Sequence, residues 1–395
     1  MRYPLLAALV LGPAAALLMG NAGVFSATTP IPASPAAAPV ARPCDSKCSA
    51  DWLDANLRLN QVQMTGTSVS AKLRPESGVL AVIRMGGDRA AADSLDFGQP
   101  ALAAQLDADV RALSFDVLHD PEGGAFRNPA IAGMGMVLLP DDFRAAMQKP
   151  GFKVLHVPDV DYRSSCLTLK DCLGQVAAWS RAHPRHLPIL ITLSTIEEKT
   201  PMPGAVTPPA FDAAALAALE REVRAVFAPE QLITPAMVRG RHAGLRQAVQ
   251  AEGWPKLGTI RGKVMFALDG KSASRYRGAL MFAVGDRPGN AIVMVNDPVR
   301  ESARIAAALQ AGLLVMTRAD EGTVEARSND VTRRDAAFAS GAQIVLTDFA
   351  VSDPTIGPYR VSLADHPEAR CGKMLGTENC IRVLETPLAV MASLP

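Results

Sequence analysis

The sequence lacks any imbalance between its charges. Lys and Arg together number 40 and Asp and Glu number 39 in 395 residues, so the formal net charge is +1. A chain that binds nucleic acid or an anionic surface through its overall field carries a clear excess of positive charge. The composition therefore gives no support for a nucleic-acid partner.

Other patterns are also missing. Neither Cys-x-x-Cys pairs nor His residues at metal spacing supply the four ligands of a structural zinc site. No internal repeat, no signal of oligomerisation and no amphipathic membrane-docking helix stands out. Any functional interpretation therefore rests on local motifs.

The apolar run near the N-terminus is too broken to predict a membrane span. Arg2 precedes the run Leu5 to Met19, which a Gly-Pro pair interrupts and small residues follow. This pattern is typical of a signal peptide over residues 1–27, whereas a retained anchor needs roughly 20 uninterrupted apolar residues. The composition of residues 28–43 predicts a Pro/Ala linker. We therefore expect a secreted or periplasmic protein whose folded domain spans residues 44–395.

Six cysteines fall into three close pairs. In an exported chain the oxidising compartment favours disulfides over free thiols. Several pairings are open to six cysteines, so the pairing of neighbours is only the simplest expectation. The neighbouring pairs are Cys44 with Cys48, Cys166 with Cys172, and Cys371 with Cys380.

Apolar strand candidates alternate with helical stretches, which predicts an α/β fold. The spacing over about 300 residues suits a single (β/α)8 TIM-type barrel, and a flavodoxin-like open sheet is the alternative. Helices are expected within 211–227 and 330–340. The expected strands are Leu57 to Met64, Leu113 to Leu118, Phe152 to Val157, Ile189 to Leu193, Val264 to Leu268, Ile292 to Val295, Leu313 to Thr317 and Ile344 to Thr347.

One stretch, residues 151–172, joins a predicted strand to a histidine, a polar loop and a capped helix. His156 lies at the end of the strand, and Arg163 lies in the loop. The sequence Thr168 to Asp171 is a capping pattern that begins a helix. The chemistry of closed parallel barrels lies at the carboxyl ends of the strands, so His156 is a candidate site residue, although a hydrogen-bonded structural histidine is the more common case.

Asp116 is the second candidate, because it lies in the strand before an acidic, glycine-rich turn. By position Asp116 and His156 would point into one pocket from neighbouring strands, as an acid/base pair does. A structural carboxylate paired with an Arg is the alternative for Asp116. His119, in the loop after this strand, is a further imidazole over the same mouth.

These residues resemble the calcium-dependent, phosphoinositide-specific phospholipase C family of secreted bacterial proteins. The resemblance runs from about Leu57 to Arg370 and includes NQVQMTGT, FDVLHDPEGG, GFKVLHVPDVDYRSSCLTLKDCL, LITPAMVRG, RGKVMFALD and TRADEGTVEARSNDVTRRDAAFASGAQIVLTDF. It implies a TIM-barrel phosphodiesterase that binds one Ca²⁺. The implied reaction is cleavage of a phosphodiester through attack of the inositol 2-hydroxyl.

The chain departs from this family at positions that carry the chemistry. Where the family has a His base followed by an Asn ligand of calcium, this sequence has Ser68 and Val69. Where the family has further ligand carboxylates, it has Ser114 and Ser194. Asp116 matches a remaining metal ligand, and His156 matches the histidine that protonates the leaving oxygen.

The substitutions predict weak or absent calcium binding and impaired catalysis. Calcium takes about six to eight oxygen ligands, and its affinity follows the number of carboxylates. A serine without a neighbouring base does not take a proton near pH 7, so Ser68 does not replace the histidine base. His119 is a weak candidate for that role.

Three functions stay open from the sequence. The first is a phosphodiesterase of the phospholipase C type with altered metal dependence, or a related glycerophosphodiester hydrolase. The second is a non-catalytic barrel that binds a phosphorylated polyol or phosphoinositide headgroup through His156, Arg163 and Arg318, with transient contact to a membrane surface. The third is an interaction protein with a vestigial pocket.

Overall fold

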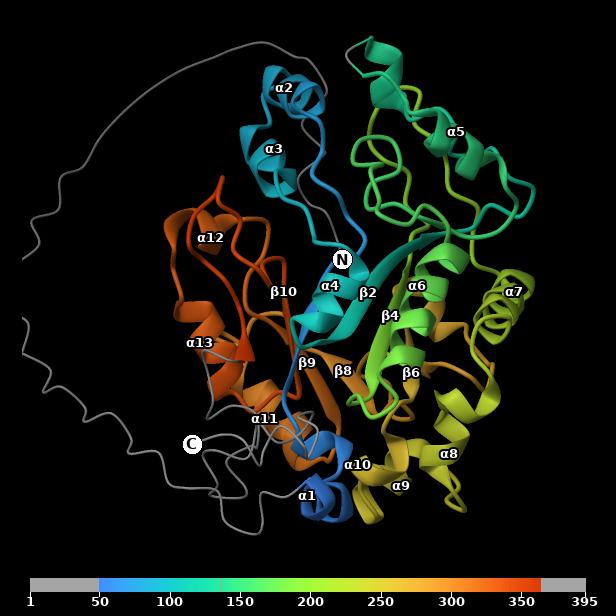
Figure 1. Cartoon of the computed structure of the whole chain (residues 1–395), viewed down its shortest axis with the longest axis vertical. Helices are drawn as coiled ribbons and strands as arrows, with labels where there is room; N and C mark the ends of the chain where they lie inside the picture. Colours follow the sequence, from blue (N-terminus) through green and yellow to red (C-terminus); the bar gives the residue numbers. More distant parts are fainter. Residues whose placement is uncertain (1–49, 136, 364–395) are drawn as a thin grey trace, which may run out of the picture.

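The computed structural model describes residues 50–135 and 137–363. The expected signal peptide, the linker and the cysteines Cys44, Cys48, Cys371 and Cys380 lie outside these residues. The strands form one mainly parallel sheet that curls into a barrel with helices around it (Figure 1). The prediction of an α/β TIM-type barrel is confirmed.

The strands close into a ring. Hydrogen bonds connect them in the order β5-β6-β4-β2-β1-β10-β9-β8, with β3 beside β2 and β7 beside β6. A parallel bridge from Val284, directly after β7, to Ile292 of β8 joins the two ends. The strands are β1 (Met64–Thr67), β2 (Val110–Leu118), β3 (Lys153–Val154), β4 (Ile189–Thr195), β5 (Leu232–Ile233), β6 (Val264–Asp269), β7 (Phe282–Ala283), β8 (Ile292–Met294), β9 (Leu314–Arg318) and β10 (Ile344–Thr347).

The helices surround this ring and cover both of its ends. Figure 1 shows α2, α3, α5 and α12 at one end and α1, α8, α9 and α10 at the opposite end. No helix within the described residues is long and apolar enough to span a membrane. The helices are α1 (Ala50–Asn56), α2 (Ser77–Met85), α3 (Arg89–Leu95), α4 (Leu102–Asp107), α5 (Asp141–Gln148), α6 (Leu169–Ala182), α7 (Ala213–Arg224), α8 (Pro235–Arg239), α9 (Leu245–Ala251), α10 (Leu257–Ile260), α11 (Ser302–Gln310), α12 (Val324–Ser328) and α13 (Thr332–Ala339).

Three predicted helices are confirmed by local chemistry. The Thr168 hydroxyl caps α6 by accepting a hydrogen bond from the Asp171 N–H at 3.2 Å. The stretch 211–227 contains α7, whose Leu216, Leu219 and Val223 are buried. The stretch 330–340 contains α13.

Alternation along the strands separates the barrel interior from the outer layer. On β2, Ala112 belongs to the apolar cluster inside the barrel, whereas Leu113 and Phe115 belong to the cluster shared with α6 and α7. Because successive strand residues point to opposite faces, Ser114 and Asp116 share the interior side with Ala112. The barrel is therefore apolar at its base and polar toward the carboxyl ends of its strands.

Two predicted strands are wrong in detail. The first begins at Met64 and not at Leu57, because residues 59–61 form a 3-10 turn after α1 and the buried leucines there pack into the interior cluster. The third, predicted over 152–157, is reduced to β3, which pairs antiparallel with the end of β2 through Val117 and Val154. The apolar residues of 152–157 are buried outside the ring of strands. The apolar run in the sequence therefore indicated burial and not a strand of the barrel.

Candidate functional site

The mouth of the barrel contains a small hollow that is partly open to solvent. Three segments line it: the end of β2, the residues after β1, and the loop that follows β3. Its polar lining consists of Lys72, Ser114, Asp116, His156, Arg163 and Ser164. Three residues that the sequence nominated thus come together in one hollow, namely Asp116, His156 and Arg163.

Asp116 and His156 are in direct contact. The Nδ1 atom of His156 lies 2.6 Å from Oδ2 of Asp116, and both side chains are more than nine-tenths buried. The antiparallel pairing of Val117 with Val154 places the two residues side by side. His156 therefore reaches the mouth from a hairpin beside β2. The sequence had predicted that it would lie at the end of a neighbouring barrel strand, which is wrong.

A buried ion pair lies next to this contact. Nζ of Lys72 is 3.2 Å from Oδ2 of Asp161, and both side chains are fully buried. Nζ also donates to the carbonyl oxygens of Leu95 and Phe97 at 2.8 and 2.5 Å, and lies 4.3 Å from the Phe97 ring centroid. Burial lowers the pKa of Lys72 and raises that of Asp161, and each charge opposes the shift of the other. Each ion therefore depends on its partner to stay charged.

Backbone hydrogen bonds hold this arrangement in place. Val157 and Asp161 exchange bonds of 3.1 and 2.8 Å in a tight hairpin directly after His156. The segment around Lys72 pairs antiparallel with the segment around Ser164, through bonds of 3.1 and 2.8 Å. Asp161 and Lys72 thus belong to two strand-like segments that are fixed to one another across the mouth.

The positions that the resemblance assigns to calcium hold few suitable donors. Val69 is buried in an apolar cluster with Phe97. The N–H of Ser114 donates to Oγ of Ser70 at 2.8 Å, and Ser194 is half-buried. Ser68, at the position of the base, is 1% exposed and its Oγ has no hydrogen-bond partner.

These residues do not fit a calcium ion. Asp116 is the one carboxylate among the four ligand positions, and His156 already contacts it. Lys72, whose ammonium pairs with Asp161, lines the same hollow. Within residues 50–135 and 137–363 no group of three or more His, Cys, Asp or Glu side chains is arranged to hold a metal. This donor set therefore differs from the six to eight oxygen ligands that calcium takes in proteins.

Two other nominated residues lie apart from the hollow. The His119 ring packs against Phe152 and Phe211, with centroid distances of 5.3 and 5.8 Å. Arg318, at the end of β9, is 4% exposed and donates to Oδ2 of Asp348 at 3.2 Å and to the Asp320 carbonyl at 3.1 Å. Neither side chain is placed to contact a ligand in the hollow.

Arg318 belongs to a buried polar cluster at the ends of β9 and β10. Asp320 accepts hydrogen bonds from the Asp348 N–H at 2.7 Å, from the Thr347 hydroxyl, and from the Tyr359 hydroxyl at 3.3 Å. Burial and the neighbouring Asp348 charge raise the pKa of Asp320 to about 7. Two carboxylates here share one arginine.

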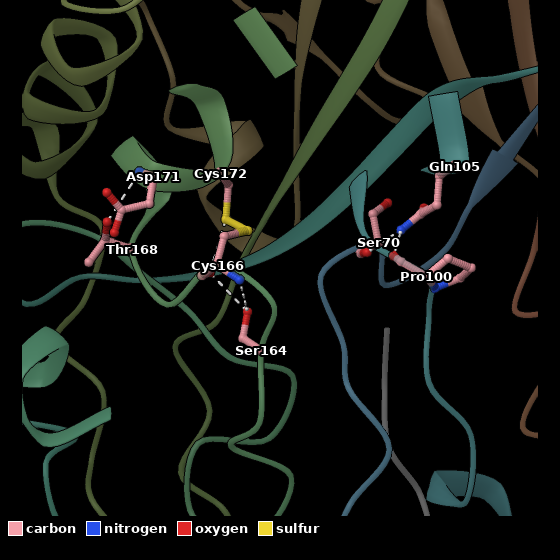
Figure 2. The surroundings of a disulfide bond; sticks show 8 residues. All are labelled: Ser70, Pro100, Gln105, Ser164, Cys166, Thr168, Asp171 and Cys172. Atoms are coloured by element: carbon pink, nitrogen blue, oxygen red, sulfur yellow. Dashed lines mark hydrogen bonds between the residues drawn. A yellow bond between two sulfur atoms is a disulfide. The ribbon is translucent and has the colours of Figure 1, made fainter. Parts of the chain in front are cut away.

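A disulfide fixes the loop that carries Arg163 and Ser164. Cys166 and Cys172 are bonded at the start of α6, so this predicted neighbour pair is present in the structure. Figure 2 shows Ser164 beside Cys166, where its hydroxyl donates to the Cys166 carbonyl at 2.9 Å. In the same view Gln105 donates to the carbonyls of Ser70 and Pro100, which holds the segment after β1 against α4.

Sequence reasoning missed Lys72 and Asp161. The signal that could have found Lys72 is its place in a run of small and apolar residues directly after the first strand. Asp161 was visible as one acid of a polar loop, and nothing local connects it to Lys72. Ser164 was missed as well, because a serine in a polar loop is unremarkable.

One family model and several solved structures are similar to this chain. The family model for calcium-dependent phosphoinositide phospholipase C matches residues 57–372. A calcium-dependent phosphoinositol-specific phospholipase C from a Pseudomonas species is similar at 16% identity over 80% of this chain and 99% of that chain, with a TM-score of 0.48. The structure of the same enzyme described as a myoinositol complex is similar at 15% identity over 80% of this chain and 99% of that chain, with a TM-score of 0.48.

A calcium-dependent phosphatidylinositol-specific phospholipase C from Streptomyces antibioticus is similar at 14% identity, over 74% of this chain and 94% of that chain, with a TM-score of 0.46. No curated protein sequence matches the chain. The family match extends over most of the sequence and includes every segment that lines the hollow. This chain belongs to the family of calcium-dependent phosphoinositide phospholipases C.

Proposed function

We propose that this barrel binds the phosphorylated polyol headgroup of phosphoinositides at its mouth and does not carry out the calcium-dependent cleavage of its family. One observation carries the proposal: the hollow keeps Asp116, His156 and Arg163 together, whereas the calcium positions supply a single carboxylate. A guanidinium and an imidazole are suitable partners for a phosphate group.

The buried serine at position 68 supports the loss of catalysis. Attack by the inositol 2-hydroxyl needs a group that removes its proton, and Ser68 is 1% exposed with no hydrogen-bond partner for its hydroxyl. Loss of a general base alone costs roughly 10²–10⁴ in rate. The metal that would stabilise the developing charge also lacks its ligands here.

A second candidate is a metal-independent phosphodiesterase. The 2.6 Å contact between His156 and Asp116 favours it, because a carboxylate that orients a histidine preserves a proton donor for the leaving oxygen. Glycerophosphodiester hydrolysis would use the same barrel and lacks the same base. This candidate predicts slow turnover that is insensitive to EDTA and absent in His156→Ala.

Calorimetry with myo-inositol 1-phosphate tests headgroup binding directly. We expect binding by the wild type in EDTA, and a loss of about tenfold or more in affinity for Arg163→Ala, since a charged hydrogen bond contributes about 1.5–3 kcal/mol. The matched control is Arg300→Ala, because Arg300 is an exposed arginine beyond β8 that lies 3.7 Å from Asp297.

Turnover of phosphatidylinositol, with calcium or with EDTA, separates the candidates. Binding without turnover supports the proposal. Turnover that needs calcium contradicts it, and turnover in EDTA that disappears in His156→Ala favours the second candidate. Absence of both binding and turnover would leave an interaction protein with a vestigial pocket.

We further propose that residues 1–27 are removed as a signal peptide, that residues 28–43 are a linker, and that residues 44–395 are exported as one domain that meets phosphoinositides at a membrane surface. The apolar run with its basic start supports the first step. N-terminal sequencing of the protein recovered from the medium or the periplasm tests it. A mature chain that still begins at Met1 would contradict the proposal.

A further inference from the structure

The carboxyl ends of β2, β4 and β6, which are neighbouring strands in Figure 1, carry polar side chains in one row. The register pairs Asp116 of β2 with Ser194 of β4, and Ser194 with Asp269 of β6. Leu190 of β4 and Met265 of β6 belong to the apolar cluster inside the barrel. Since successive side chains alternate between the two faces of a strand, Ser194 and Asp269 lie on the inner face, as Asp116 does. We call these three residues the polar row.

Asp269 has one anchored carboxylate oxygen and one open oxygen. Its Oδ1 accepts a hydrogen bond from the Gly270 N–H at 2.7 Å. The side chain is half-buried, and Oδ2 makes no hydrogen bond or ion pair with any residue that the structure describes. Lys271, two residues further on, pairs instead with Glu198 at 2.6 Å. The Asp269 carboxylate therefore has a fixed orientation and keeps acceptor capacity for a ligand.

The turn after Asp269 connects the end of β6 to the end of β4. Gly270 has a φ of +90°, and a Cβ at this position would lie 3.0 Å from the Thr195 hydroxyl oxygen and 3.1 Å from the Thr195 carbonyl oxygen, so the turn requires a glycine. The Thr195 hydroxyl donates to the Asp269 carbonyl at 3.2 Å and contacts the Ser272 hydroxyl at 2.6 Å. These contacts keep Ser194 and Asp269 side by side.

The two ends of the polar row have opposite chemistry. Arg163 and His156 line the hollow at the β2 end, where they suit a phosphate group. Neighbouring strands are about 4.8 Å apart, so the backbone of Asp269 lies roughly 9.5 Å from that of Asp116. A phosphorylated polyol has the same polarity, because it carries an anion at one end and hydroxyl donors at the other.

We propose that Asp269, with Ser194 beside it, determines the specificity of the mouth by binding ring hydroxyls of the polyol whose phosphate lies at Arg163 and His156. This inference rests on the proposed function. A carboxylate oxygen accepts hydrogen bonds from hydroxyl groups, and a serine hydroxyl both donates and accepts. The Asp269 charge also repels a phosphate, so it fixes the direction in which the ligand lies. The mouth therefore selects a hydroxylated ring over other phosphate esters.

The experiment compares two ligands by calorimetry in EDTA. One is myo-inositol 1-phosphate, and the other is cyclohexyl phosphate, which has the ring and the phosphate without the other hydroxyls. We expect the wild type to bind the first about tenfold or more tightly, because hydrogen bonds to a charged group are stronger than neutral ones. Asp269→Asn keeps an acceptor for the Gly270 N–H and replaces Oδ2 by a donor. Its affinity for myo-inositol 1-phosphate should fall about tenfold, and its affinity for cyclohexyl phosphate should stay the same within about twofold.

Three further variants separate the contributions. Ser194→Ala should lose about twofold to fivefold in affinity for myo-inositol 1-phosphate, since a neutral hydrogen bond contributes less. Arg163→Ala should weaken both ligands equally, because it removes a phosphate contact that they share. The matched control is Asp212→Asn, because Oδ1 of Asp212 likewise accepts a backbone N–H, that of Ala215 at 2.8 Å, at the start of α7. This control should bind both ligands as the wild type does.

Two results would overturn the proposal and leave headgroup binding intact. They are equal affinities of the wild type for the two phosphates, and an Asp269→Asn variant that keeps the preference of the wild type. Free myo-inositol, detected by saturation-transfer NMR, covers the case in which neither phosphate binds. If its binding is lost in Asp269→Asn and kept in Asp212→Asn, the role of Asp269 is supported and the proposed function is contradicted. If none of the three ligands binds, both are overturned.

Discussion

The buried carboxylates on the two sides of the barrel mouth have different partners. On the β2 side, Asp116 contacts His156 and Asp161 contacts Lys72, so each carboxylate has a basic partner next to the hollow. On the side of β9 and β10, Asp320 and Asp348 share hydroxyl and backbone donors with one arginine, Arg318. The β2 side therefore has matched charges beside the hollow, whereas the side of β9 and β10 has surplus negative charge.

The difference assigns separate roles to the two sides. Matched charges beside an opening allow an anionic ligand to approach without leaving a carboxylate unpaired. Surplus negative charge among buried groups favours the protonated carboxyl, which the raised pKa of Asp320 reflects. We therefore regard the β2 side as the ligand side, and the side of β9 and β10 as a structural region whose stability depends on pH.

The largest expected effect is the loss of the Lys72 partner. Asp161→Asn leaves a fully buried ammonium without its counter-ion, and breaking such a pair costs about 3–5 kcal/mol of unfolding free energy. The equivalent change on the other side, Asp348→Asn, should cost much less, because it also relieves repulsion with Asp320. Urea unfolding of both variants measures the difference.

Equal losses in the two variants would contradict this distinction between the two sides. Asp120→Asn is a useful control, since Asp120 pairs with buried Lys153 at 2.9 Å in the same way. Its cost should resemble that of Asp161→Asn.

The next effect is the pH dependence of stability on the β9 and β10 side. The folded-state pKa of Asp320 is about 7, above its ordinary value of 3.8. The folded state then holds more protons than the unfolded state between these values, so this stabilising contribution is complete below pH 3.8 and lost as pH rises through about 7. Chemical unfolding from pH 4 to pH 8 should show this fall, and Asp320→Asn should reduce it.

If the unfolding free energy of Asp320→Asn falls with pH as steeply as that of the wild type, Asp320 is not the group that titrates. Asp348→Asn gives a second check, because removal of the neighbouring negative charge should bring the pKa of Asp320 down. The fall in stability would then still begin near pH 3.8 but would end at a lower pH.

The barrel was predictable because most of its strands are continuous apolar runs. β2, β4, β6, β9 and β10 each hold four or more buried residues in sequence, and the predicted positions match them. β5 and β7 are two residues long, and no pattern of two residues distinguishes a strand from a loop. The stretch 152–157 misled because burial beneath a helix layer and burial within a sheet give the same apolar run.

The site was predictable only in part, because its charges pair over long distances in the chain. Asp116 and His156 could be nominated since each lies at a recognisable strand end. The ion pair of Lys72 with Asp161 depends on two segments that are far apart in the sequence and pair with one another across the mouth. The same holds for Arg318, which was proposed as a ligand residue because nothing local indicates that Asp348 engages it.

The smallest expected effect belongs to Ser68, at the position where the family has its base. Its hydroxyl is buried without a hydrogen-bond partner, so Ser68→Ala removes a desolvated polar group and should change the unfolding free energy by less than about 1 kcal/mol. Affinity for myo-inositol 1-phosphate should stay the same within twofold, because Ser68 is not among the residues that line the hollow. A large loss of phosphatidylinositol turnover in Ser68→Ala would mean that this serine takes part in proton transfer after all, and the ligand side of the mouth would then be a working active site with an unusual base.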